Sequence, residues 1–295
     1  MTPPFYFSRP PRAVPSTVRL RVLFGGMLNQ MGWFFFGFGM IFVWIFLLHA
    51  DLTSFYLFRG DLETVPGTLT TSQRTSFSEG GSKGRRGTPI YQHQYTYTAD
   101  GIRYDGVSYS TGYNLQAGAR VTIEYPRGKP GLSRIHGMRR AAFGPVVAFV
   151  IIFPLVGAGL LAPGLRQGWR ANRLLAQGKV ALGTLQSKEP TNSRINNKPV
   201  YKLTFQFRAD DGQTYSAVAK TYQPGDLEDD QQEELVYDPL FPTCAVMVDS
   251  LPGSPRIDER GLIQPCGLWP ALRVLIVPLI TMIGHTIYVC AKILP

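Results

Sequence analysis

Charged and metal-binding side chains are scarce in this chain of 295 residues. Charged residues make up 17% of it, whereas soluble domains have roughly 25%. The three cysteines and four histidines exclude a disulfide framework and a four-cysteine zinc site. Hydrophobic residues account for 44% of the chain, which excludes general disorder. The net charge of +10 points to nucleic acid or an anionic membrane surface.

Motifs for metal and nucleotide chemistry are also absent. The chain has no G-x-x-x-x-G-K-[ST] phosphate loop and no H-E-x-x-H metal motif. The cysteines, at 244, 266 and 290, and the histidines, at 49, 93, 136 and 285, have no ligand spacing. We therefore expect no catalytic residue, no cofactor and no metal, and we predict that the protein is not an enzyme.

Three long apolar runs carry much of the hydrophobic content. They cover residues 31–48, 141–165 and 274–291 and contain no Asp, Glu, Lys or Arg. A helix needs about 20 mostly apolar residues to cross a bilayer, so each run predicts a transmembrane helix. The alternative for each is a buried core helix. We place the helices at 31–50, 141–165 and 271–292, after a basic, proline-rich N-terminal tail at 1–30.

The positive charges predict the orientation in the membrane. The tail has no acidic residue and four arginines, Arg9, Arg12, Arg19 and Arg21, and such flanks are retained in the cytoplasm. Three spans then place residues 52–140 outside and 166–270 in the cytoplasm. Three prolines in the second run leave open a re-entrant segment, which would put both regions on one side.

The two segments between the apolar runs are typical of β-structure. Residues 91–98 and 201–208 alternate with a period of two, which predicts strands with one buried face. Each is followed by Asp-Gly, a strong hairpin signal. Tyr201 lies 110 residues after Tyr91, and Tyr237 lies 112 after Tyr125, which predicts internal duplication. We expect two antiparallel β modules, each a small sandwich or open barrel, at 52–140 and, after a basic connector, within 166–270.

Three polar stretches are predicted to be loops. Residues 71–89 are long, basic and rich in Gly and Ser, and residues 187–198 are polar and rich in turn formers. Residues 226–234 hold six acidic side chains without the glycine and spacing of a calcium loop. This last stretch predicts a solvated acidic loop.

The sequence resembles a bacterial family of membrane proteins of unknown function, in which a small β domain lies between transmembrane helices. The resemblance lies in the second module, in a Tyr-Asp-Pro-x-x-Pro segment and in the glycine and aromatic residues of its strands and turns. These residues are Gly178, Gly183, Tyr201, Phe205, Phe207, Gly212, Tyr215, Tyr237, Asp238, Pro239 and Pro242. The first module departs from the pattern, with Arg127 after Tyr125-Pro126. The resemblance implies a fold and a membrane location but no reaction, and we predict that the protein lies in the bacterial inner membrane.

Two polar features near the predicted helices are candidate sites. Arg166, Trp169, Arg170 and Arg173 follow the second run on one helical stripe, a pattern that suits anionic lipid headgroups. His285 lies inside the third run with no acidic residue in any run. It is either a hydrogen-bonded packing residue or part of a proton path.

These observations favour a non-enzymatic membrane protein whose β modules mediate interaction or assembly. The predicted partners are membrane lipids and either another membrane or envelope protein or a second copy. Nucleic acid is not expected, because the positive charge is concentrated in the tail, the first module and the stripe beside the membrane. Alternatives are an accessory subunit or small transporter with a polar path near His285, and a membrane-bound hydrolase.

Overall fold

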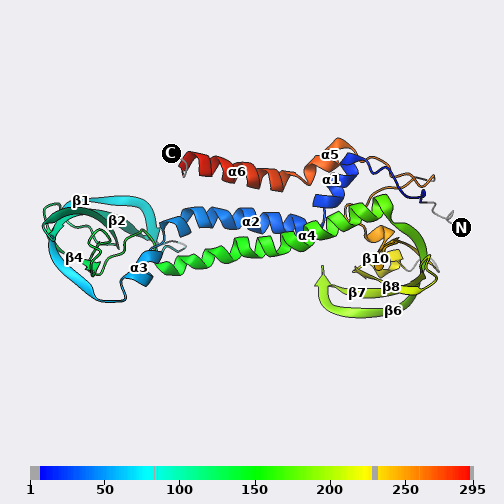
Figure 1. The fold of residues 1–295 in the computed structure, drawn as a ribbon, viewed down its shortest axis with the longest axis horizontal. Helices are drawn as coiled ribbons and strands as arrows, with labels where there is room; N and C mark the ends of the chain where they lie inside the picture. The colour runs from blue at the N-terminus through cyan, green and yellow to red at the C-terminus, as the bar shows by residue number, and fades with distance from the viewer. Residues whose placement is uncertain (1–6, 83, 85, 228–231, 259, 293–295) are drawn as a thin grey trace. The chain divides into compact units, whose positions relative to one another are not determined.

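The computed structural model describes residues 7–82, 84, 86–227, 232–258 and 260–292 (Figure 1). The chain divides into two compact units, one of residues 39–153 and one of residues 1–38 with 154–295. Each unit contains one five-stranded antiparallel sheet and parts of the long helices. The units are described separately.

The first unit begins with the end of a long helix and continues into the first sheet. Its elements are α2 (Met27–Ile45), shared with the other unit, η1 (Leu47–His49), α3 (Leu52–Leu57), β1 (Leu62–Glu79), β2 (Thr88–Ala99), β3 (Ile102–Thr111), β4 (Arg120–Pro126), β5 (Arg134–Ile135) and η2 (Pro145–Ile151). The strand order is β3-β2-β1-β4-β5.

The first sheet curls until its two edges meet. β3 contacts β5, and just beyond β5 the backbones of Tyr109 and Arg139 exchange hydrogen bonds of 2.7 and 3.1 Å. Five antiparallel strands in a partly open barrel are the architecture of the OB-fold. Of the two expected arrangements, sandwich and open barrel, the first module has the open barrel.

The second unit contains the other sheet and most of the helices. Its elements are α1 (Ser16–Phe24), α4 (Ile152–Gln177), β6 (Lys179–Ile195), β7 (Lys198–Arg208), β8 (Thr214–Thr221), η3 (Pro224–Leu227), β9 (Glu233–Asp238), β10 (Phe241–Met247), η4 (Val248–Ser250), α5 (Leu268–Arg273) and α6 (Ile276–Lys292). The order β10-β9-β6-β7-β8, with β8 against β10, repeats the first sheet strand for strand.

The two sheets also share their irregularities. In β1 the register to β2 shifts after Leu69, which lies opposite Tyr95. In β6 it shifts after Leu185, which lies opposite Phe205. A second shift follows Arg74 in β1 and Pro190 in β6. A bulge is a local irregularity that bends a strand and is retained within protein families. Bulges at equivalent positions of β1 and β6 therefore support the predicted duplication.

The first strand of each module is longer than the sequence predicts. β1 continues through most of the stretch predicted as a loop and pairs Glu79 with Thr88. β6 continues to Ile195 and turns through Asn196 and Asn197, which have φ of 49° and 62°. Both loop predictions were therefore wrong in extent. In β6, the Asn-Asn pair forms a tight hairpin turn. In β1, Ser and Thr residues form a strand although they are exposed. Lys83 and Arg85 lie outside the described residues.

Small residues of α4 pack against α1 and α2. The buried positions Pro154, Gly157, Gly164, Gly168 and Ala171 follow the three- and four-residue spacing of a helix-pair seam. A Cβ at Gly157 would lie 2.3 Å from the backbone N of Phe36, so only glycine allows this approach. The small pair noted in many membrane helices is present here as Ala158 and Ala162, but both are exposed.

Two of the described helical segments are long and apolar enough to cross a membrane: Met27–His49, with 23 residues, and Pro145–Gln177, with 33. Only 22% and 17% of their apolar windows are buried. The third predicted span corresponds to α6, which has 17 residues. Two candidate spans are therefore present by length and composition, and the third is a shorter apolar helix.

The N-terminal segment is not a simple tail. Residues 16–24 form α1, whose Val18 and Val22 are buried against Ala171 and Leu175 of α4. Arg12 donates to the carbonyl of Leu175 at 3.1 Å. Burial lowers the pKa of Arg12 to about 10, so its side chain is still charged at neutral pH.

Candidate functional site

The predicted basic stripe lies on the C-terminal half of α4. Arg166, Trp169 and Arg170 are exposed and line a groove of about 540 Å³ beside Leu23 of α1. Arg173 also lines this groove, but its guanidinium lies 3.1 Å from the carboxylate of Asp238. The stripe therefore divides into two exposed arginines and one that attaches α4 to the second barrel.

The residues of the Tyr-Asp-Pro motif have structural roles in that barrel. Asp238 also accepts a hydrogen bond of 3.0 Å from the backbone N of Leu240, which closes the turn that contains Pro239. Pro242 lies in β10. Of the aromatic motif residues, Phe205, Phe207 and Tyr237 are buried, and Tyr201 is half-buried.

The glycines of the motif are explained by space and backbone geometry. A Cβ at Gly183 would lie 2.9 Å from Leu235, and one at Gly178 would lie 2.3 Å from Val236. Gly212 has φ of +78° in the β7–β8 turn, a conformation that favours glycine. Phe205, Phe207 and Tyr237 belong to one hydrophobic core cluster of the barrel, and the glycines lie at its close contacts and in a turn.

A polar cluster closes the end of the second barrel beside that turn. Asp210 accepts a hydrogen bond of 3.0 Å from the hydroxyl of Tyr237 and forms an ion pair with Lys179. The hydrogen bond from Lys179 is the main cause that lowers the pKa of Asp210, and burial raises the pKa of Tyr237. The cluster fixes the first strand of the barrel to the β7–β8 turn.

His285 of α6 contacts α2. Its Nε2 lies 3.2 Å from the carbonyl oxygen of Gly37, and a Cβ at Gly37 would lie 2.4 Å from the hydroxyl of Thr281. This contact is consistent with the packing role among the two roles predicted for His285.

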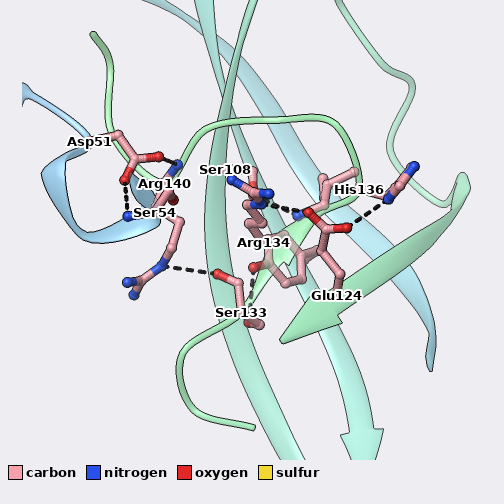
Figure 2. Close-up of polar contacts among 10 residues, drawn as sticks. Asp51, Ser54, Ser108, Glu124, Ser133, Arg134, His136 and Arg140 are labelled. Atoms are coloured by element: carbon pink, nitrogen blue, oxygen red, sulfur yellow. Dashed lines mark hydrogen bonds and ion pairs between the residues drawn. The ribbon is translucent and has the colours of Figure 1, made fainter. Parts of the chain in front are cut away.

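Sequence reasoning missed a polar cluster in the first barrel (Figure 2). The buried carboxylate of Glu124 binds Arg134 at 2.6 Å and His136 at 2.7 Å. Arg134 also stacks on the ring of Phe58, 4.3 Å from its centroid. Glu124 thus joins β4, β5 and the following turn.

A second group of Figure 2 ties the barrel to the helix ends. Asp51 is buried, and its carboxylate caps α3 through Ser54 N at 3.0 Å and accepts from the backbone N of Arg140 at 2.7 Å. The side chain of Arg140 donates to the carbonyl of Ser133 at 3.2 Å. The Ser133 hydroxyl lies 2.9 Å from the hydroxyl of the buried Tyr95.

A third polar group surrounds His93, whose side chain is fully buried between β1 and β3. Its Nδ1 lies 2.9 Å from the hydroxyl of Ser72, and its Nε2 lies 2.8 Å from that of Ser110. Burial lowers the pKa of His93, opposed by a smaller effect of the Tyr113 backbone.

The second barrel has apolar residues where the first has these polar groups. Leu203, Phe205 and Phe207 replace His93, Tyr95 and Tyr97 at the same register positions. Val236 and Val246 replace Glu124 and Arg134, and Ala245 replaces Ser133. An alignment of the two repeats would have indicated the cluster, because polar residues in the first repeat stand opposite apolar residues in the second.

The described residues offer no clear site for metal or nucleophile chemistry. No group of three or more potential metal ligands occurs among them. One G-x-S-x-G pattern is present at residues 80–84, but it lies in the β1–β2 hairpin, whereas a nucleophile elbow joins a strand to a helix. Of the predicted acidic loop, Glu228, Asp229 and Asp230 lie outside the described residues, and Glu233 is buried in β9.

Comparisons with known proteins give little. No family model and no curated protein matches the chain. A solved structure, described as "Structure and Conformational Change of a Replication Protein A Heterotrimer Bound to ssDNA", is 10% identical over 61% of this chain and 44% of that chain, with a TM-score of 0.17. The chain thus spans less than half of that relative, and so low a score establishes no shared fold.

This finding corrects the partners predicted from the sequence. We had predicted membrane lipids with another membrane or envelope protein or a second copy, and had excluded nucleic acid. The comparisons give no support to these partners, so the assignment of partners, with its exclusion of nucleic acid, is withdrawn. Net charge and its distribution are physically insufficient to identify a partner.

Proposed function

We propose that the protein is a non-enzymatic integral membrane protein of the bacterial inner membrane, with three spans, whose two β modules mediate interaction or assembly at the cell envelope. The observation that carries the membrane assignment is the direction of the side chains on the long helices. Several of their glycines lie at the contacts between helices, and many of their large apolar residues face outwards. A buried core helix of a soluble protein has the opposite arrangement.

Each long helix exposes bulky apolar side chains. Exposed residues are Phe34, Phe38 and Ile41 on α2, Leu155 and Val156 on α4, and Leu279, Ile280 and Ile283 on α6. Between lipid-embedded helices, association depends on close packing of small residues. The contacts of Gly157 with Phe36 and of Gly164 with Asn29 have this character.

The shorter α6 is compatible with a third span. Its 17 residues extend over about 25 Å at 1.5 Å per residue. A bilayer accommodates such a mismatch by thinning and by snorkelling of flanking cations. Lys292 lies at one end of α6, and Arg273 precedes the other.

The interaction role rests on exposed apolar residues at the turn between β9 and β10. Leu240 and Phe241 are 73% and 59% exposed, and the adjacent Asp238 fixes the turn through its hydrogen bond to Leu240 N. We take these two adjacent exposed apolar side chains as the proposed contact surface of the barrel.

Cysteine labelling tests the membrane topology. In a chain whose three cysteines are replaced by serine, Gln116→Cys reports on the first module and Gln213→Cys on the second; both positions are exposed. With a cytoplasmic N-terminus, a membrane-impermeant maleimide should label position 116 in intact cells and position 213 only after permeabilisation. Labelling of both positions in intact cells, or of neither, would contradict three spans.

The interaction role has a separate test. Replacing Leu240 and Phe241 with serine should reduce the size of the particle extracted in mild detergent. Replacement of the exposed Ile102 of the first barrel serves as the matched control. Equal particle sizes for the wild type and the Leu240/Phe241 variant would refute a role for this turn.

A further inference from the structure

The buried His93 is connected to the protein surface by a chain of hydrogen bonds. Ser72 bridges His93 Nδ1, at 2.9 Å, and the side-chain amide of Asn114, at 2.8 Å. On the other side, Ser110 bridges His93 Nε2, at 2.8 Å, and the backbone carbonyl of Tyr113, at 2.8 Å. Asn114 and Tyr113 belong to the β3–β4 loop, and both are exposed.

The number of hydrogens fixes the direction of one half of this chain. Ser110 has one hydroxyl hydrogen, which it donates to the Tyr113 carbonyl because a carbonyl can only accept. The Ser110 oxygen must therefore accept from His93, so Nε2 carries a hydrogen. Whether Nδ1 also carries one is then the only variable at the ring.

The other half of the chain has two complete arrangements. With neutral His93, Ser72 donates to Nδ1, and its oxygen accepts from the amide NH₂ of Asn114. With protonated His93, Nδ1 donates to Ser72, whose hydrogen then goes to the amide oxygen of Asn114. The structure has that oxygen toward Ser72, and a half-turn of the amide gives the other arrangement.

We propose that His93 is a buried proton sensor whose protonation state sets the orientation of the Asn114 amide and so changes the exposed β3–β4 loop with pH. All polar groups in both arrangements are satisfied, so the switch breaks no buried hydrogen bond. Loss of a proton changes only which end of an exposed amide faces Ser72.

Among the side chains of this hydrogen-bond network, His93 is the group that titrates. The groups facing it are the hydroxyls of Ser72 on β1 and of Ser108 and Ser110 on β3, and Asn114 and Tyr113 in the loop. Serine and asparagine do not titrate, and a tyrosine phenol does so near pH 10. The ion pair of Glu79 and Arg139 reaches the end of β3 at Thr111.

The second barrel lacks the counterparts of Ser72, His93 and Ser108, although Thr221 keeps a hydroxyl at the register position of Ser110. Lys188 and Leu203 occupy the register positions of Ser72 and His93, and Ala219 occupies that of Ser108. The second barrel is therefore an internal control within the same chain.

Nuclear magnetic resonance of the full chain in detergent micelles, with ¹⁵N-labelled histidine and asparagine, tests the proposal. Between pH 4.5 and 8, the Asn114 side-chain amide should shift with the same midpoint as the His93 ring, below 6.5. Asn196 and Asn197 of the second barrel should not move. Different midpoints for His93 and Asn114, or an immobile Asn114 signal while His93 titrates, would overturn the proposal without any variant.

Two substitutions separate His93 from the other ionisable groups. His93→Leu, the residue of the second barrel, should abolish the Asn114 shift. His136→Gln, at an exposed histidine bound to Glu124, should leave it unchanged. Persistence of the shift in folded His93→Leu, or its loss in His136→Gln, would assign the response to another group and refute the proposal.

Discussion

Glu124 and Arg134 face each other on β4 and β5 of the first barrel, with carboxylate oxygen and guanidinium nitrogen 2.6 Å apart. At the same two register positions of the second barrel, Val236 lies opposite Val246. One chain therefore builds the same cross-strand pair twice, once from ions and once from apolar side chains. The contribution of the ion pair to stability can therefore be measured by giving the first barrel the valines of the second.

Replacing one partner of this pair should destabilise the first barrel, and replacing both should not. Glu124→Val leaves Arg134, whose side chain is 21% exposed, without its counter-ion, and breaking a buried pair costs about 3–5 kcal/mol. The double variant Glu124→Val/Arg134→Val copies the second barrel and should fall within about 1 kcal/mol of the wild type. The free energy of local opening, measured by hydrogen exchange in β4, gives both values.

An exposed ion pair provides the control for that cycle. Glu63 and Arg127 are 3.7 Å apart and largely exposed, so Glu63→Ala should cost less than about 1 kcal/mol. A Glu124→Val effect no larger than that of Glu63→Ala would show that burial adds nothing to the pair.

The hydroxyl of Tyr95 should stabilise the first barrel but not fit the second. Tyr95→Phe removes the 2.9 Å hydrogen bond to Ser133 and should cost about 1–3 kcal/mol. Phe205→Tyr should be at least as costly, because Ala217 stands where Gly106 leaves room for the Tyr95 ring. Hydrogen exchange in β2 and β7 reports on each barrel, and Tyr113→Phe, at an exposed ring, is the control.

The sequence predicted those parts of the fold that depend on residues close together in the chain. The alternation at 91–98 and the following Asp-Gly predicted β2 and its hairpin, since period and turn chemistry act within ten residues or so. The extension of β1 to Glu79 was missed, because its exposed Ser and Thr residues show no buried face and only pairing with β2 defines the strand.

The polar groups of the first barrel were missed for a related reason. Asp51 and Arg140 lie far apart in sequence, as do Arg139 and Glu79, and nothing in local spacing indicates that they meet. Arg173 lines the same groove as Arg166 and Arg170, but its partner, Asp238, is supplied by a strand of the second barrel, which spacing along α4 does not indicate.

Glycine positions on α4 should differ sharply in their tolerance of a methyl group. At Gly157 a Cβ would lie 2.3 Å from a backbone atom of Phe36, whereas at Gly159 it meets nothing within 4 Å. Gly157→Ala should therefore cost about 1–3 kcal/mol by forcing the helices apart. Gly159→Ala should be neutral or stabilise the helix by up to about 1 kcal/mol. Thermal unfolding in detergent measures both, and equal midpoints would contradict this helix contact.

The three arginines of the α4 stripe should also behave differently. Arg173→Ala removes the 3.1 Å ion pair with Asp238 and should loosen the β9–β10 turn by up to about 1 kcal/mol, because the arginine is half-exposed. Arg170→Ala, at an exposed residue of the same helix face, should have no such effect. Hydrogen exchange at Leu240 and Phe241 reports on the turn. Equal effects would mean that Arg173 does not anchor it.

Acidification should weaken the first barrel through His93. Burial lowers the pKa of His93 from 6.5, so the unfolded chain binds a proton at a higher pH than the folded chain does. Stability from the neutral ring is then complete above pH 6.5 and declines as the pH falls toward the lower folded pKa. His93→Leu should remove this part of the pH dependence, whereas His136→Gln should retain it. The free energy of opening of β2, measured by hydrogen exchange at several pH values between 5 and 8, tests the sign. A first barrel that becomes more stable as the pH falls through this range would contradict a buried neutral imidazole.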